Sequence, residues 1–251
     1  MKTFKLLFAI WATLIFAGFM LIFLPFILIP PVFGHGGTGF TFYVLKTWCW
    51  LFSKISFINY RIAGTEKLKK NQPYIYVSNH TSFLDLPGLC LAIPGQFRPL
   101  AKKELLGIPV FGWVVKAVTV VVDRSSADSR NQSLLNLIRI LKLGIPALIF
   151  PEGTQNRTDQ ILQPFKDGAF RMALETQAPI VPITINGAGD LLPPGTFSAR
   201  PGIIQIQIGE PILPESYKGM SPQDLKSHTF ERMKEMLLDM QKTNSTEYAF
   251  F

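Results

Sequence analysis

The sequence predicts an α/β protein in which a mixed, largely parallel central sheet carries helices on both faces and follows a membrane-associated hairpin of two helices. From about residue 74 onward, short runs of β-branched and aromatic residues alternate with longer amphipathic segments. The first 60 residues are much more apolar than the rest and are divided by proline and glycine. The length of 251 residues fits one folded domain with an appendage. We therefore expect a membrane anchor in residues 1–60 and an α/β domain in residues 61–251.

The first arm of the hairpin is expected in residues 6–24 and is expected to be embedded in the membrane, since this run is about long enough to cross the hydrocarbon core of a bilayer. Residues 6–45 as a whole lack Asp, Glu, Lys and Arg. The prolines at positions 25, 30 and 31 are expected to end this helix, and the glycines of residues 34–39 to form a flexible turn. A helix that spans the bilayer fully is one alternative. A cleaved signal peptide is another, although the apolar run is long for one and no small-x-small cleavage site ends it.

The second arm is expected in residues 40–58, which are rich in Phe, Trp and Tyr but carry Lys46 and Lys54. These two lysines lie about 80° apart on a helical wheel, which predicts one charged face on a helix that lies in the membrane interface. Together with the basic residues at the start of the chain and in the run 61–70, they favour the cytoplasmic face of the cell membrane.

Within the α/β domain, the spacing of apolar residues and the turn residues between them separate strands from helices. Ser221 as an N-cap and Pro222 in the first turn mark the start of the last helix. Strands are expected at residues 74–77, 119–122, 147–150, 180–185 and 203–208. Helices are expected at residues 86–92, 104–115, 127–143, 167–176 and 222–240.

The composition narrows the range of ligands. A net charge of +8 with 48% hydrophobic residues favours an anionic lipid bilayer as a partner, and the sequence has neither the basic runs nor the zinc-spaced cysteines of a nucleic-acid-binding protein. The two cysteines, Cys49 and Cys90, lie in apolar segments and predict no disulfide framework. The three histidines lack the spacing of metal ligands, so neither a metal site nor another cofactor is expected.

His80 and Asp85 lie five residues apart, directly after the strand expected at residues 74–77. Catalytic groups gather at the carboxyl ends of strands in an α/β sheet. On one helix the two side chains would point about 140° apart. With His80 in the loop and Asp85 in the first turn of the next helix, however, the carboxylate can accept a hydrogen bond from one imidazole nitrogen. The other nitrogen can then take a proton from a hydroxyl group, and Asp85 would stabilise the imidazolium that forms.

Two further blocks carry charged residues. The first begins with AKKELLGIPVFGW at residue 101 and ends with Asp-Arg at residues 123–124. The second is FPEGTQNR at residues 150–157, which follows an apolar strand. A tight turn with free backbone N–H groups, the Glu152 carboxylate and the Arg157 guanidinium are therefore expected at the same sheet edge as the histidine.

The sequence NHTSFLD at residues 79–85, together with these two blocks and VPI at residues 181–183, resembles the glycerophospholipid acyltransferase family, and within it the 1-acylglycerol-3-phosphate acyltransferases. The resemblance covers about residues 62–208, with the motifs in the family's order and spacing. It implies transfer of an acyl group from acyl-CoA or an acyl carrier protein thioester to the sn-2 hydroxyl of lysophosphatidic acid, giving phosphatidic acid without a covalent acyl-enzyme. It also implies catalytic roles for His80 and Asp85, and acceptor binding by Asn79, Lys102, Arg124, Glu152, Gly153, Thr154 and Arg157.

Two positions depart from the family's pattern, since Val118 replaces a glycine and Gln155 stands where an arginine is expected. Arg157 would then supply the charge for the phosphate, or the acceptor is another lysolipid, such as a lyso-aminolipid. Two other interpretations remain open. A serine hydrolase would use a serine of the first motif, Ser82 or Ser78, although the sequence contains no Gly-x-Ser-x-Gly elbow. A lipid-binding protein would keep the fold without catalysis.

Overall fold

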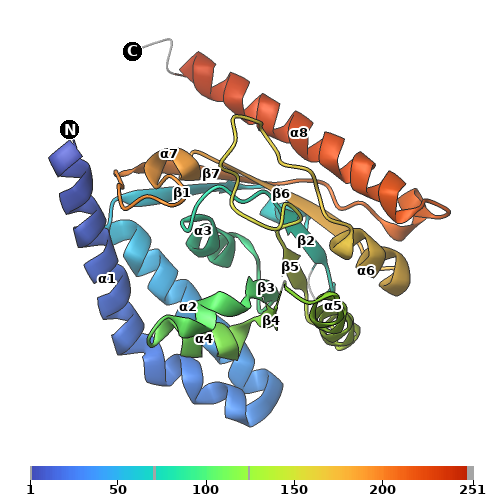
Figure 1. Ribbon diagram of the computed structural model, residues 1–251, viewed down its shortest axis with the longest axis horizontal. Coiled ribbons are helices and arrows are strands. Elements are labelled where there is room, and N and C mark those ends of the chain that lie inside the picture. The colour runs from blue at the N-terminus through green and yellow to red at the C-terminus, as the bar shows by residue number, and fades with distance from the viewer. Residues whose placement is uncertain (1, 70–71, 124, 248–251) are drawn as a thin grey trace.

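In the computed structural model, which describes residues 2–69, 72–123 and 125–247, seven strands form one sheet in the order β1-β7-β6-β2-β5-β3-β4 (Figure 1). Neighbouring strands are parallel except β6 and β7, which pair antiparallel. This confirms the mixed, largely parallel sheet that the sequence predicts. The strands are β1 (Ile58–Ala63), β2 (Ile75–Ser78), β3 (Arg98–Lys102), β4 (Val120–Val122), β5 (Ala147–Ile149), β6 (Ile180–Asn186) and β7 (Gly202–Ile208).

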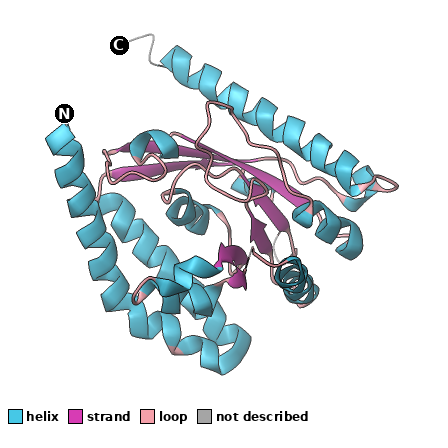
Figure 2. Ribbon diagram, viewed as in Figure 1, coloured by secondary structure: helices cyan, strands magenta, loops and turns pink. Residues whose placement is uncertain are grey.

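Helices cover both faces of the sheet, as predicted (Figure 2). Successive strand residues point to opposite faces, so Tyr76 packs into one buried cluster while Ile75 and Val77 pack into the other. The first cluster joins the sheet to α1 (Lys2–Leu28), α2 (Gly34–Ile55), α3 (Asp85–Ala92), α4 (Phe111–Val118) and α7 (Ala188–Leu191). The second joins it to α5 (Ala127–Lys142), α6 (Gly168–Thr176) and α8 (Pro222–Glu247).

The helices α1 and α2 pack as the predicted hairpin, but their junction corrects the prediction. Pro25 lies inside α1, where the Ile29 N–H donates to the Pro25 carbonyl at 3.0 Å, so the proline removes one donor without ending the helix. The chain turns instead through a short 3-10 helix, Pro30–Phe33. Residues 34–39 form the first turns of α2 rather than a flexible turn. Gly37 has a packing role there, because a Cβ atom at this position would collide with the Pro30 carbonyl oxygen.

One face of the second arm packs into the protein core, and its position in a membrane interface stays a prediction. Phe42, Trp48 and Phe52 on α2 are buried in the first cluster. Lys46 is half-buried and donates from Nζ to the Ile93 carbonyl at the end of α3, at 2.5 Å. Lys46 therefore does not share an outer charged face with the exposed Lys54, because the protein itself supplies the partner that its ammonium group needs.

Two strands were missed by the sequence prediction, and one helix was placed wrongly. β1 pairs with β7 at the edge of the sheet and starts at Ile58, so it lies across the expected boundary at residue 60, and the division into two domains stays a prediction. The strand β3 pairs with both β4 and β5. The helix expected at residues 104–115 is split into a 3-10 helix, Lys103–Gly107, and α4, with Pro109 between them.

Candidate active site

The His80–Asp85 pair forms in the way its spacing predicts. The strand β2 ends at Ser78, in the middle of the sheet between β5 and β6, and His80 lies in the loop that follows. The helix α3 begins at Asp85 and brings its Oδ2 atom to 2.8 Å from His80 Nδ1. Because Nδ1 faces a carboxylate, it carries the proton, and Nε2 is left as an acceptor.

The Asp85 carboxylate organises the whole loop. Its side chain is fully buried, and Oδ2 also accepts from the backbone N–H groups of Thr81 at 2.7 Å and Ser82 at 2.9 Å. The His80 ring stacks on Phe150, with ring centroids 4.1 Å apart and planes 20° from parallel. The His80 side chain keeps an exposed fraction of 16%, so a fixed imidazole remains open on one side.

Glu152 fixes the backbone around the histidine. Its Oε1 atom accepts from the His80 N–H at 2.9 Å, and its Oε2 atom accepts from the Gln163 N–H at 2.9 Å. The Asn156 N–H donates to the His80 carbonyl at 2.6 Å, so the loop after β5 holds both backbone groups of His80. Burial raises the pKa of Glu152, while the two N–H donors oppose this shift. Both carboxylate oxygens thus accept hydrogen bonds within the protein, and the binding of an acceptor hydroxyl by Glu152 stays a prediction.

Replacing Glu152 by glutamine is therefore expected to destabilise the protein by about 1–3 kcal/mol, because the new NH₂ group would face a backbone N–H donor in a buried place. Activity should fall as well, since the His80 backbone loses one of its two supports. Urea unfolding and an activity assay on the same preparation measure both effects. The exposed Glu175 on α6 provides the matched control, Glu175→Gln. Equal stability of the two variants would contradict this role for Glu152.

Asn79 also acts within the protein. It is buried, its Nδ2 atom donates to the Ile185 carbonyl at 2.9 Å, and its Oδ1 atom accepts from the Ile185 N–H at 2.8 Å. The side chain therefore extends the hydrogen bonding between β2 and β6 just beyond the point where β2 ends. These bonds fix the backbone next to His80, and acceptor binding by Asn79 stays a prediction.

The remaining predicted site residues are more loosely connected with the histidine. Gly153 has a φ of +81° in the tight turn after β5, Thr154 is exposed, and the exposed Arg157 lies with its guanidinium against Gly195. Lys102 is exposed at the end of β3, beyond β5 from the histidine. Arg124 lies outside the described residues. Four of the predicted residues thus lie together in one hydrogen-bonded region. His80 bonds to Asp85 and Glu152, and the adjacent Asn79 bonds to Ile185.

Sequence reasoning missed the contributions of Phe150, Asn156 and Gln163. Phe150 directly follows β5, the neighbour of β2, so its position at the strand end was the available signal. Asn156 lies inside the FPEGTQNR block, but it contacts His80 through its backbone N–H. Any residue type except proline can make such a hydrogen bond, so the sequence carries no signal for it. For Gln163, no signal in the sequence indicated that its N–H reaches Glu152.

The serines of the first motif do not face the histidine. Ser82 is buried, and its Oγ atom donates to the Leu192 carbonyl at 2.8 Å. Ser78 is buried too, and its Oγ atom donates to the Asn79 carbonyl at 3.1 Å. Neither hydroxyl is placed as a nucleophile for His80. Within the described part of the chain, no group of three or more His, Cys, Asp or Glu side chains could hold a metal ion.

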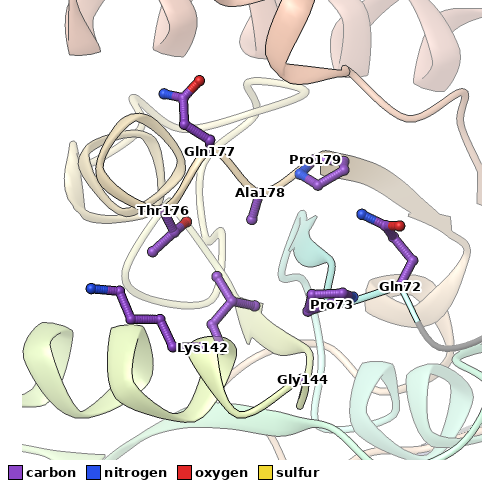
Figure 3. A pocket seen from close by; sticks show the side chains of 9 residues that line it. Gln72, Pro73, Lys142, Gly144, Thr176, Gln177, Ala178 and Pro179 are labelled. Carbon is purple, nitrogen blue, oxygen red and sulfur yellow. The ribbon is translucent and has the colours of Figure 1, made fainter.

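A shallow pocket of about 230 Å³ lies at the opposite edge of the sheet (Figure 3). Three of the residues that line the pocket lie just before strands: Pro73 before β2, Gly144 before β5 and Pro179 before β6. These are the amino-terminal ends of strands whose carboxyl ends carry the His80 loop and the Glu152 turn. This pocket is therefore separate from the candidate site.

The segment Lys2–Phe33 is long and apolar enough to cross a membrane, judged by length and composition. Most of it is not covered by the rest of the protein: Leu7, Leu14 and Ile22 on α1 are each more than half exposed. An exposed apolar helix of this length favours membrane association over burial in a soluble core.

Several known proteins are similar in sequence to this chain. A family model described as Acyltransferase matches residues 59–186, about half of the chain. The chloroplast 1-acyl-sn-glycerol-3-phosphate acyltransferase BAT2 of Brassica napus is 35% identical over 75% of this chain and 54% of its own length. The human 1-acyl-sn-glycerol-3-phosphate acyltransferase alpha is 31% identical over 76% of this chain and 66% of its own. The chain thus spans about half the length of the plant relative.

A solved structure is similar over nearly the whole chain. The crystal structure of the 1-acyl-sn-glycerophosphate acyltransferase PlsC from Thermotoga maritima superposes with a TM-score of 0.83, covering 96% of this chain and 98% of that one. The sequence identity is 24%, so this likeness concerns the fold, including the helices before the sheet.

Proposed function

The chain belongs to the acyltransferase family, and on this premise we propose that it transfers a fatty acyl group from a thioester to the sn-2 hydroxyl of 1-acylglycerol-3-phosphate, giving phosphatidic acid. The observation that carries the proposal is the 2.8 Å contact between His80 Nδ1 and the buried Asp85 Oδ2, with the His80 side chain still partly exposed. This arrangement suits a base that activates a hydroxyl group brought to it by a substrate.

In the proposed reaction, His80 Nε2 takes the proton of the acceptor hydroxyl as its oxygen attacks the thioester carbonyl carbon. The tetrahedral intermediate then collapses, the carbon–sulfur bond breaks, and the imidazolium returns the proton to the leaving thiolate. Asp85 stabilises the imidazolium between these two steps. The Gly153 N–H donates to the Phe150 carbonyl at 3.0 Å, so the backbone N–H of Thr154 in the same turn is the group we propose as an oxyanion donor.

For the acceptor, we propose that the phosphate is bound by the basic side chains Lys102, Arg124 and Arg157, because a dianionic group requires cations. Gly153 and Thr154 lie on the turn that would contact the glycerol. Asn79 and Glu152 contribute by holding the loops in place. The anchor is α1, and the basic residues near it favour the cytoplasmic face of the cell membrane.

Gln155 favours a second candidate acceptor. Its Nε2 atom is buried without a hydrogen-bond partner among the described residues, at the position where the family pattern has an arginine. A neutral amide donor suits a head group with less negative charge than a phosphate monoester. A lysolipid with such a head group, for example a lyso-aminolipid, is therefore the alternative to lysophosphatidic acid.

The test is acyl transfer by the purified full chain in mixed micelles. Long-chain acyl-CoA and an acyl carrier protein thioester are each offered with lysophosphatidic acid and, in parallel, with other lysolipids. Formation of phosphatidic acid supports the proposal and identifies the donor. Product only with another lysolipid would replace the acceptor. Lysolipid binding without product from any pair would favour a lipid-binding protein of the same fold.

Replacing Ser82 by alanine separates acyl transfer from serine hydrolysis. We expect activity to stay within about tenfold of the wild type, because the hydroxyl bonds to Leu192 and does not reach the reacting atoms. Stability should fall by about 1–3 kcal/mol, since the Leu192 carbonyl loses its buried donor. The measurement is the rate of acyl transfer and of thioester hydrolysis at a temperature where both proteins are folded. A folded variant without either activity would support the hydrolase instead.

A further inference from the structure

The segment that joins β3 to α4 exposes large apolar side chains. Leu106 is 38% exposed, Ile108 44% and Trp113 58%. We refer to residues 106–113 as the β3–α4 loop, including the first residues of α4. Soluble proteins expose single apolar residues commonly, but three within eight positions form a local patch that needs a partner.

The loop is tightly built, so the exposure of these side chains is a fixed feature. The Phe111 N–H donates to the Pro109 carbonyl at 2.7 Å, and the Gly112 N–H donates to the Ile108 carbonyl at 2.8 Å. Val110 has a φ of +63°, which β-branched residues rarely adopt. Gly112 is required by close packing, because a Cβ atom there would collide with the Leu106 carbonyl oxygen.

The loop leads into a helix that packs against the exposed apolar helix at the start of the chain. The helix α4 packs against α1, and the rings of Phe111 and Phe16 lie 6.3 Å apart between centroids. The helices α1, α2 and α4 share the buried cluster on one face of the sheet, and Figure 1 shows them on the same side of the molecule. The surface of α1 that remains uncovered is apolar along its length.

The charges around the loop suit a lipid surface. Lys102 and Lys116 are exposed on either side of it. Lys103 pairs with Asp123, which follows β4, at 3.1 Å. Glu104 is an exposed acidic residue in the 3-10 helix before the loop. A tryptophan with neighbouring lysines is typical of the boundary between hydrocarbon and head groups, where aromatic rings sit and ammonium groups reach the phosphates.

We propose that the β3–α4 loop is a second contact with the bilayer, which inserts Leu106, Ile108 and Trp113 into the interface beside α1. The inference rests on the proposed attachment of α1 to a membrane. Two contacts with the bilayer fix the orientation of the α/β domain relative to the membrane, whereas attachment through α1 alone leaves the domain free to rotate. Because the loop follows the carboxyl end of β3, the His80 edge of the sheet is turned toward the lipid surface, where a lysolipid hydroxyl can reach it.

The experiment places an environment-sensitive fluorophore on the loop. Both native cysteines are buried, so a thiol-reactive nitrobenzoxadiazole probe should label an added cysteine selectively. Ile108→Cys carries the probe, and Trp113→Cys provides a second position. Leu143→Cys is the matched control, because Leu143 is 62% exposed but follows α5 on the other face of the sheet. The labelled full chain is mixed with vesicles of phosphatidylcholine and phosphatidylglycerol, with and without nitroxide-labelled lipid.

We expect a blue shift and strong nitroxide quenching at positions 108 and 113, with neither at position 143. Protein that floats with the vesicles while all three positions behave alike would overturn the second contact and leave the α1 attachment intact. Protein that does not float would overturn the attachment, and the second contact with it. A blue shift caused by an acyl carrier protein without vesicles, with no lipid quenching, would overturn the proposal and assign the patch to a protein donor.

Discussion

Replacing His80 by alanine is expected to lower kcat for acyl transfer by about 10²- to 10⁴-fold, the usual contribution of a positioned general base. The substrate hydroxyl would then have to lose its proton to water. The protein should remain folded, because hydrogen bonds of the His80 backbone hold the loop without using the imidazole. The His80 N–H donates to the Glu152 carboxylate, and the His80 carbonyl accepts from the Asn156 N–H. The KM for the acyl donor should change little, since the imidazole acts on the reacting hydroxyl.

The measurement is initial-rate kinetics of phosphatidic acid formation in mixed micelles, with circular dichroism of each variant. The exposed His228 on α8 offers a matched control, and His228→Ala should keep wild-type rates. Equal rates for the wild type and His80→Ala would refute the base mechanism. Loss of activity in both histidine variants would point to a general effect on the preparation.

The pairing of His80 with Asp85 was predictable because it depends on five residues of local chain. A strand end, a short loop and a helix start leave few ways to arrange two side chains, and the structure adopts the one that joins them. The sheet was predictable for a similar reason, since its central strands are apolar on both faces. The strands β1 and β3 escaped prediction because they contain charged residues, Arg61 in β1 and Arg98 and Lys102 in β3, in place of a continuous apolar run.

The role of Glu152 could not be read from the sequence. Its partners are backbone N–H groups of residues 80 and 163, which carry no residue-type signal. Lys46 was misjudged for a related reason. A helical wheel shows where a lysine points, but a partner such as the Ile93 carbonyl comes from a helix far along the chain. In both cases the fold itself supplies a partner that the sequence does not reveal.

Replacing Asp85 by asparagine is expected to lower kcat by up to about 10⁴-fold, the loss found when the orienting aspartate of a catalytic triad is made neutral. The side chain is buried, and its Oδ2 atom accepts three bonds, from His80 Nδ1 and the N–H groups of Thr81 and Ser82. An asparagine oxygen can take this place, so the loop should persist. The imidazolium, however, would lose the charge that stabilises it.

The stability of the Asp85→Asn variant depends on two opposing effects. The Oδ1 atom of Asp85 is buried without a partner among the described residues, so an NH₂ group in its place would be an unsatisfied donor that costs about 1–3 kcal/mol. The substitution also removes a buried charge and its desolvation cost, which offsets part of this loss of stability. We therefore expect a net destabilisation smaller than the effect on catalysis, measured by urea unfolding of the wild type and the variant.

The decisive experiment combines the two substitutions. If Asp85 acts through His80, the double variant should have the same kcat as His80→Ala alone, because an aspartate cannot stabilise an imidazolium that never forms. If the two residues acted independently, the losses would multiply and the double variant would be slower than either single one by the other's full factor. Multiplied losses in folded proteins would refute the pair, whereas equal rates for His80→Ala and the double variant would tie both residues to one proton transfer.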